Sequence, residues 1–452
     1  MSPNQPFGFG PGDADDSGGR NPPGGGMPGF GAGGPFDMSS LGAALQQLGA
    51  MLQSGASGPD AGGPVNWAVV TDVARKALAA EGDPSVAQAE HRAVVEAVRL
   101  ADVWLDPAVT FPAVTAEPAA WSRSQWLEAT MPVWRTVITP IAEQMAAAVG
   151  PAASGPGLDL AALNESLPEQ LRAMLPDGIP AEMAQMLGPM MGMVQQLGAT
   201  AFSMQVGQAL AGLAGEVVSG SDIGIPLTGE PLPALLPRNV AAFGEGLGLP
   251  VDDVRLYLAL RESAHQRLFS HVAWLRPRVI GAVEEYARGV RVDQSRLAAA
   301  MGDIDMSNPQ ALQDALSSGV LMPEDTDEQR AAIARLEALL ALVEGWVDDV
   351  VDTAIAGRLA SAVQLRETIR RRRAAGGPAE KMFATLVGME LRPRLAREAA
   401  TLFAVMRAGR GIEARDALWG HPDLLPSPEG LGDPLGFIED SATELDFGPD
   451  ST

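Results

Sequence analysis

The chain has 452 residues and 46% of them are hydrophobic, which is enough for one large core or two to three smaller ones. It contains no cysteine, so disulfide bonds and thiolate zinc sites are excluded. The net charge of −24 argues against nucleic acid and anionic lipid as partners.

The first 63 residues are rich in glycine, proline and aspartate, and they are predicted to form a disordered arm. The arm does not open with a basic segment followed by an apolar stretch, so we predict no signal peptide and expect a cytoplasmic protein. Leucines recur at helical spacing between Met38 and Leu52, which predicts a short helix over 38–52. Two interpretations stay open: a helix that docks on a partner, and a transient helix that has none.

Residues 64–426 are predicted to form a helical domain, because helix formers dominate and aromatic strand formers are scarce. The predicted fold class is therefore all-α or mainly α. Helix-start patterns occur at Asp83-Pro84, at Ser122 with Gln125 and at Thr326 with Gln329. The predicted helices are 65–81, 84–105, 123–148, 158–174, 180–219, 251–275, 277–289, 308–318, 327–356, 361–374, 378–388, 391–408 and 411–419.

Residues 183–215 carry no charged side chain. A membrane span would also be free of charge, but glutamines are spread through this stretch and Pro189 interrupts it. Its glycines suit close contact between helices in a core. We therefore predict that this stretch belongs to a central buried helix pair, and we predict no membrane span.

Two charged segments follow near the C-terminal end. Arg370–Arg373 close the helix predicted over 361–374, where they could bind an anion or an acidic partner, or could be a solvated helix end that suits the helix dipole. Residues 427–452 carry acidic side chains and no basic one, which predicts a disordered acidic tail.

The most informative segment is the helix predicted over 251–275. Zinc peptidases place H-E-x-x-H on such a helix, where two histidines one turn apart bind the metal and the glutamate acts on its water. Here the string reads Arg261-Glu262-Ser263-Ala264-His265, with arginine in the place of the first histidine. By itself, this spacing also fits an ordinary helix with a core histidine.

A wider set of strings resembles a family of zincin-like metallopeptidases from actinobacteria, with a sister branch associated with the biosynthesis of a deazaflavin coenzyme. The resemblance spans roughly residues 63–424 and implies a zincin-like helical core. The strings that carry it are GPVNWAVVTDVAR, GEGLGLPVDDVRLYLALRESAHQRLFSHVAWLRPRV, LLALVEGWVDDVVD and GGPAEKMFATLVGMELRPR.

The resemblance implies a role for each motif residue. Glu262 matches the general base, His265 the second metal ligand, and Glu344 a third ligand from a Glu-Gly-His string on a later helix. Arg261 and Trp346 stand where metal-binding members have histidine. The resemblance implies zinc as cofactor, but a guanidinium has no lone pair for a metal, so we predict that zinc is not bound here.

Another candidate ligand is Glu285, which lies 20 residues after His265, a distance at which some zinc peptidases place their third ligand. It ranks below Glu344 because the resemblance does not support it.

These residues and the resemblance leave two candidate functions. The first is a zinc-dependent metallopeptidase-like hydrolase that is weakly active or inactive because its motif is degenerate. The second is a non-catalytic binding or scaffold protein that keeps the zincin-like fold, with a protein or peptide as partner. In either case, Arg261 is predicted to replace the charge of the metal by reaching a carboxylate on the helix at 327–356.

Overall fold

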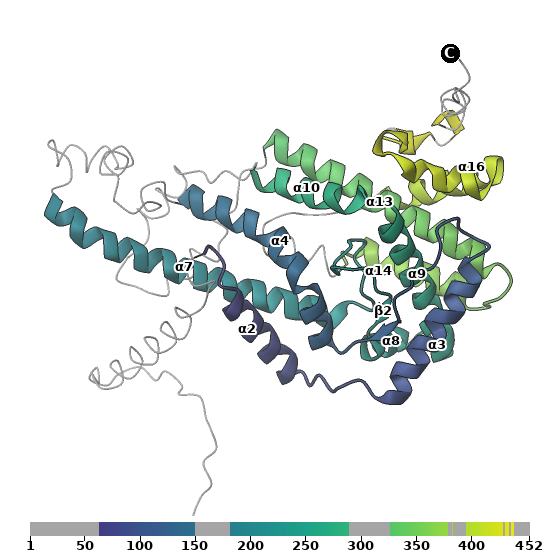
Figure 1. The fold of residues 1–452 in the computed structure, drawn as a ribbon, viewed down its shortest axis with the longest axis horizontal. Helices are drawn as coiled ribbons and strands as arrows, with labels where there is room; N and C mark the ends of the chain where they lie inside the picture. Colours follow the sequence, from purple (N-terminus) through teal and green to yellow (C-terminus); the bar gives the residue numbers. More distant parts are fainter. Residues whose placement is uncertain are drawn as a thin grey trace, which may run out of the picture. The chain divides into compact units, whose positions relative to one another are not determined.

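The computed structural model describes residues 63–149, 181–288, 326–377, 382, 395–427, 430–433 and 435–437, all of which belong to one compact unit, 55–452 (Figure 1). The described part is mainly helical, as the composition predicts. Its α-helices are α2 (Trp67–Ala80), α3 (Gln88–Leu105), α4 (Arg123–Val149), α7 (Ala181–Glu216), α8 (Pro237–Gly244), α9 (Val251–His271), α10 (Leu275–Arg288), α13 (Asp327–Ile355), α14 (Ala362–Ala374) and α16 (Ala396–Ala417).

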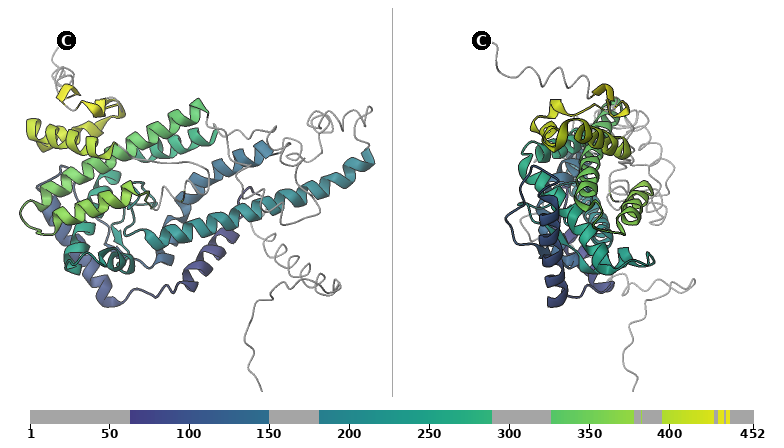
Figure 2. Two further views of the ribbon diagram at one scale, coloured as in Figure 1. Left: turned by 180° about the vertical axis from the view of Figure 1, so that it is seen from behind. Right: turned by 90° about the vertical axis from the view of Figure 1, so that its right-hand side faces the viewer.

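Helix α9 lies in the middle of the unit, against α3, α8 and α13 (Figures 1 and 2). Every side chain from Tyr257 to Leu268 is buried, so this stretch of the helix has no face toward solvent. Helix α13 is buried over most of its length and runs antiparallel to α9. Arg261 meets Glu344 of α13, while Asp253, near the start of α9, meets Ser361, which follows the end of α13. Polar residues on these two helices must therefore find partners inside the protein.

Helix α16 packs closely on α13 because position 345 is glycine. A Cβ atom on Gly345 would lie 2.5 Å from the Cβ of Ala399 and 2.6 Å from two backbone atoms of α16. Gly411 interrupts α16 with a φ of 87°, a conformation that suits only glycine. Two separate helices, 391–408 and 411–419, are predicted from the sequence on either side of this break.

A small parallel sheet joins two loops and was not predicted from the sequence. Strand β1 (Ala119–Ala120) pairs with β2 (Ala234–Leu235), and Ser219 bridges to Leu235 in the antiparallel sense. Two-residue strands are too short to show an alternating pattern. The sheet fixes the loop at 217–236 beside α9.

The capping boxes predicted at Ser122 with Gln125 and at Thr326 with Gln329 are confirmed. The start predicted at Asp83-Pro84 is wrong: α3 begins at Gln88, and the carboxylate of Asp83 instead accepts hydrogen bonds from the first backbone amides of α4. Helix α8 was not predicted. The helices predicted at 38–52, 158–174 and 308–318, and nearly all of 378–388, lie outside the described residues.

The charge-free stretch 183–215 lies within α7, and its second half packs against α2. The contact is close at Gly207, where a Cβ atom would lie 2.8 Å from the carbonyl oxygen of Val70. Val206, Leu210 and Leu213 are buried beside it. In the described part of the chain, none of the helices combines the length and apolar character that a membrane crossing needs.

The C-terminal end of the described structure extends beyond the boundary predicted at 426. Two short 3-10 helices, η2 (Leu418–Gly420) and η3 (Pro422–Leu424), follow α16, and a third, η4 (Gly430–Gly432), lies in the segment predicted as the acidic tail. Leu431 of η4 is fully buried. Most of the remaining tail lies outside the described residues, as does the arm before residue 63.

Candidate functional site

Arg261 and His265 lie one turn apart on α9 and face α13. The guanidinium of Arg261 donates to Oε2 of Glu344 at 2.5 Å and to Oδ1 of Asp348 at 2.6 Å. The side chains of Arg261 and Glu344 are each 6% exposed. The predicted contact between Arg261 and a carboxylate of the helix at 327–356 is therefore confirmed, and it involves two carboxylates.

His265 completes the contact between the two helices. Its Nε2 lies 3.0 Å from Oε1 of Glu344, and its Nδ1 lies 2.9 Å from the carbonyl oxygen of Arg261. The carbonyl and the carboxylate are both acceptors, so each ring nitrogen of His265 faces an acceptor oxygen. The ring therefore links α9 to Glu344 of α13.

Glu344 is the carboxylate at the middle of the site. Burial alone would raise its pKa, but the charges of Arg373, His265 and Arg261 together hold the pKa well below its ordinary value. The loop at 217–225 covers it, and Gly224 permits this approach: a Cβ atom there would lie 3.1 Å from Oε1 of Glu344. Gly224 also has a φ of +72°, which favours glycine.

Glu262 does not face this cluster. Its fully buried carboxylate accepts hydrogen bonds from the backbone amide and hydroxyl of Ser221 at 3.0 and 2.5 Å. It also accepts from the amide of Ala234 at 3.3 Å and from the side chain of Gln266 at 2.9 Å. The three donors from Ser221 and Ala234 fix the loop at 217–236 to α9.

The arginines of α14 pair with acidic side chains inside the unit. Arg373 contacts Glu344, Arg370 donates to Asp348 at 3.0 Å, and Arg372 donates to Asp222 at 2.9 Å. Within the run predicted as an anion site or a solvated end, only the side chain of Arg371 is mostly exposed, at 78%. The sequence could not show this, because the partners lie 22 to 150 residues away.

Trp346 lies in a different environment from Glu344. Two residues along a helix correspond to about 200°, so the two side chains point in nearly opposite directions. The indole of Trp346 donates to Oδ1 of Asp416 at 2.9 Å and packs beside Phe111 and Trp419. Asp416 and Asp349 form a second buried ion-pair group with Arg415.

Glu285 and His271 also lie apart from the cluster. Glu285, on α10, forms a partly exposed ion pair with Arg335 near the start of α13. His271, the last residue of α9, is exposed and stacks on Phe111 with ring centroids 5.6 Å apart. The structure thus brings together Arg261, His265 and Glu344 of the predicted site residues. It adds Asp348 and Arg373, which no sequence pattern placed at this site.

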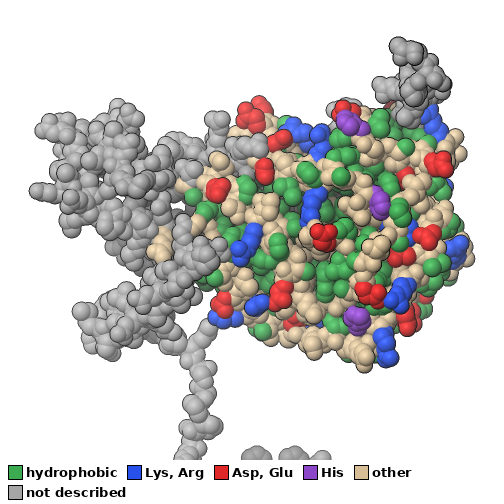
Figure 3. Space-filling view, viewed as in Figure 1, with side chains coloured by type: hydrophobic (Ala, Val, Ile, Leu, Met, Phe, Trp, Pro, Cys, Tyr) green, Lys and Arg blue, Asp and Glu red, His purple; other side chains and the backbone are tan. Residues whose placement is uncertain are grey.

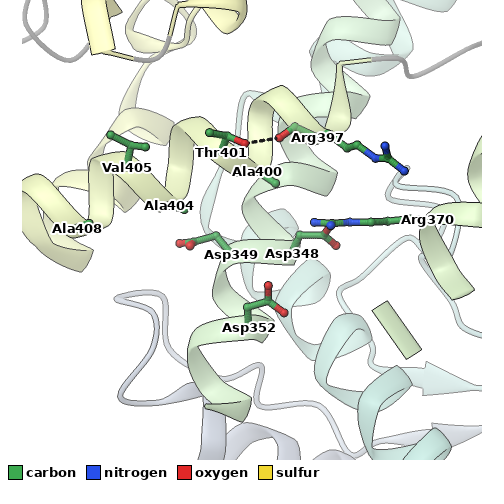
Figure 4. A pocket seen from close by; sticks show the side chains of 10 residues that line it. All are labelled: Asp348, Asp349, Asp352, Arg370, Arg397, Ala400, Thr401, Ala404, Val405 and Ala408. Atoms are coloured by element: carbon green, nitrogen blue, oxygen red, sulfur yellow. Dashed lines mark hydrogen bonds and ion pairs between the residues drawn. The ribbon is translucent and has the colours of Figure 1, made fainter. Parts of the chain in front are cut away.

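An open cleft of about 560 Å³ runs beside the cluster, between α13 and α16 (Figure 4). Asp348, Asp349 and Asp352 reach into it from α13, and Arg370 enters from α14. Small side chains of α16, such as Ala404, line the opposite side. Elsewhere on the surface, acidic and basic side chains are interspersed on the face drawn in Figure 3.

The residues present do not fit the zinc ion that the resemblance implies. Among the described residues, no group of three or more His, Cys, Asp or Glu side chains is placed to hold a metal. The guanidinium of Arg261 lies between the carboxylates, and the ring of His265 has acceptors at both nitrogens. A cation at Glu344 would have to displace guanidiniums that already pair with it.

A solved structure of a candidate hydrolase with a novel fold, from Chloroflexus aurantiacus, is similar to this chain. It is 18% identical in sequence with a TM-score of 0.55, and the match covers 85% of this chain and 99% of that one, which shows a shared fold. None of the curated proteins compared with the chain matches it. The family model of zincin-like metallopeptidases matches residues 65–438, so the chain belongs to that family.

Proposed function

We propose that this chain is a non-catalytic member of its family, a binding protein in which an ion-pair cluster stands in place of the metal centre. The observation that carries the proposal is the position of Arg261, whose guanidinium bridges Glu344 and Asp348 inside the protein. A guanidinium stays protonated and offers no lone pair, so it links α9 and α13 by charge and hydrogen bonds.

The surroundings of Glu262 support the same proposal. Metal-assisted hydrolysis needs a base within hydrogen-bonding reach of the attacking water. The carboxylate of Glu262 is fully buried and already accepts four hydrogen bonds from Ser221, Ala234 and Gln266. Those contacts suit a residue that holds a loop in place.

A second candidate function is weak metallopeptidase activity. The contact that favours it is the one between His265 and Glu344, 3.0 Å apart, since these two side chains would be the remaining ligands for zinc. In that case, α14 and Arg261 would have to move before the metal could enter, and Glu262 would have to release the loop at 217–236.

A hydrolysis assay with zinc distinguishes the two functions. The full chain is incubated with excess zinc and unfolded casein, and the products are identified by mass spectrometry, beside the same assay with the Glu262→Gln variant. We expect the two proteins to give the same background. Cleavage by the wild type that is lost in the variant would overturn the proposal and favour the peptidase.

A further inference from the structure

Three acidic residues of α13 and three arginines of α14 form an antiparallel ladder. Glu344, Asp348 and Asp352 are spaced by four residues, so they share one face of α13. They pair in turn with Arg373, Arg370 and Arg366, which run in the opposite direction along α14. Beside the ladder, Arg372 donates to the carboxylate of Asp222 and to the carbonyl oxygen of Glu216.

Four arginines of α14 pair with acidic side chains elsewhere in the unit and help to hold this helix in place. Leu365 and Ile369 are the two residues of this helix that are buried in the apolar core. The ladder also borders the open cleft between α13 and α16, which Asp348, Asp352 and Arg370 line (Figure 4). Displacement of α14 would therefore break these ion pairs and take two side chains, Leu365 and Ile369, out of the apolar core.

Displacement of α14 would leave an acidic surface. Glu344, Asp348 and Asp352 would then face Arg261, which is the remaining described guanidinium that pairs with them, together with His265. Their spacing along α13 matches arginines spaced by three and four residues on another helix, which is the spacing of Arg366, Arg370 and Arg373. Arginine suits such a surface better than lysine because its planar head presents several donors.

We infer that α14 is a displaceable arginine clasp, and that the acidic face of α13 beneath it binds a partner's helix with arginines at the same spacing. The inference rests on the proposed function as a binding protein and names the class of its partner. While α14 covers this face, it competes with the partner's helix for the same carboxylates. Its covalent connection to α13 gives it a high effective concentration in this competition.

A peptide with the sequence of residues 362–374, labelled with fluorescein, tests the inference by fluorescence anisotropy. The full chain carrying R366Q, R370Q and R373Q should bind this peptide at least tenfold more tightly than the wild type does. The matched control is Arg371→Gln, which removes an exposed arginine that pairs within α14 and should bind as the wild type does. Equal binding by wild type and the triple variant, or no binding by either, would overturn the inference.

A second substitution separates specific binding from attraction between a cationic peptide and an anionic protein. Adding E344Q and D348N to the triple variant should abolish the gain in affinity, and persistence of the gain would contradict the inference. Circular dichroism establishes that each variant is folded. The mass of the recovered peptide is then measured by mass spectrometry. Cleavage of the peptide would refute the proposed function, whereas the measured affinities alone test whether α14 can be displaced.

A single substitution covers the case in which the triple variant does not fold. In Arg373→Gln, His265 should react with diethylpyrocarbonate faster than in the wild type, since Arg373 contacts Glu344 beside it. The exposed His91, His271 and His421 should react at unchanged rates. A rate for His265 equal to that of the wild type would count against the clasp.

Discussion

Nη2 of Arg261 lies 2.5 Å from Oε2 of Glu344, and this ion pair joins two buried helices at positions 83 residues apart in the sequence. Asp348 and Arg373 extend it to a cluster that includes α14. In the function that we propose, this cluster stands where the family motif would put a metal, and its arginines supply the positive charge that the cation would supply there.

Replacing Arg261 by alanine should destabilise the protein by about 3–5 kcal/mol, because it leaves the buried carboxylates of Glu344 and Asp348 short of a partner. Urea unfolding followed by tryptophan fluorescence measures the change. The control Arg371→Ala, at a mostly exposed site, should change the free energy of unfolding by less than about 0.5 kcal/mol. Similar values for both variants would show that Arg261 is not a structural bridge.

Gly345→Ala should destabilise by about 1–3 kcal/mol or more, since the new Cβ atom would meet backbone atoms of α16 that cannot rotate away. Gly212→Ala is the matched control, because a Cβ atom at this exposed position of α7 has nothing within 4 Å. The control should stabilise by up to about 1 kcal/mol through helix propensity. Urea denaturation of both variants measures these changes in the free energy of unfolding. A loss of stability in Gly212→Ala as large as that in Gly345→Ala would refute the packing argument.

The contribution of Glu344 should depend on pH. Its folded-state pKa is lowered by Arg373, His265 and Arg261 despite burial, so the stability that it supplies is present above its ordinary pKa of 4.5 and is lost as the pH falls. Glu344→Gln should therefore be less stable than the wild type at neutral pH, and the gap should narrow below about pH 5. Denaturation at several pH values measures this gap, and a gap that widens on acidification would contradict the assigned ion pairs.

Glu262→Gln should destabilise the protein by about 1–3 kcal/mol, because an NH2 group replaces one of two buried acceptor oxygens and each of these oxygens accepts from two donors. Glu96→Gln, at an exposed position of α3, is the control and should be nearly neutral. Thermal unfolding compares the two. No loss in the Glu262 variant would mean that this carboxylate does not anchor the loop at 217–236.

The sequence was informative where a local pattern decides the outcome. The capping boxes at Ser122 and Thr326 and the break near Gly411 follow from residues within a turn of one another, and the structure has all three. The contact between Arg261 and the helix at 327–356 was also predicted, because a buried guanidinium needs a carboxylate and the resemblance placed Glu344 nearby.

The sequence was uninformative where distant segments decide the outcome. Asp83 resembles the cap of the helix that follows it, but tertiary contacts place its carboxylate at α4 instead. The arginines of α14 resemble a solvated helix end, because nothing local shows that Asp222, Glu344 and Asp348 lie within reach. Trp346 lies two residues after Glu344, but positions two apart on a helix face nearly opposite directions, and its indole donates to Asp416.

The central claim is that the cluster around Arg261 and Glu344 takes the place of a zinc site, and elemental analysis of the purified, untagged protein tests it most directly. The protein is dialysed, and its zinc content is measured for the wild type and for His265→Ala. The account predicts no stoichiometric zinc in either protein. One zinc ion per wild-type chain, lost in the His265 variant, would contradict it.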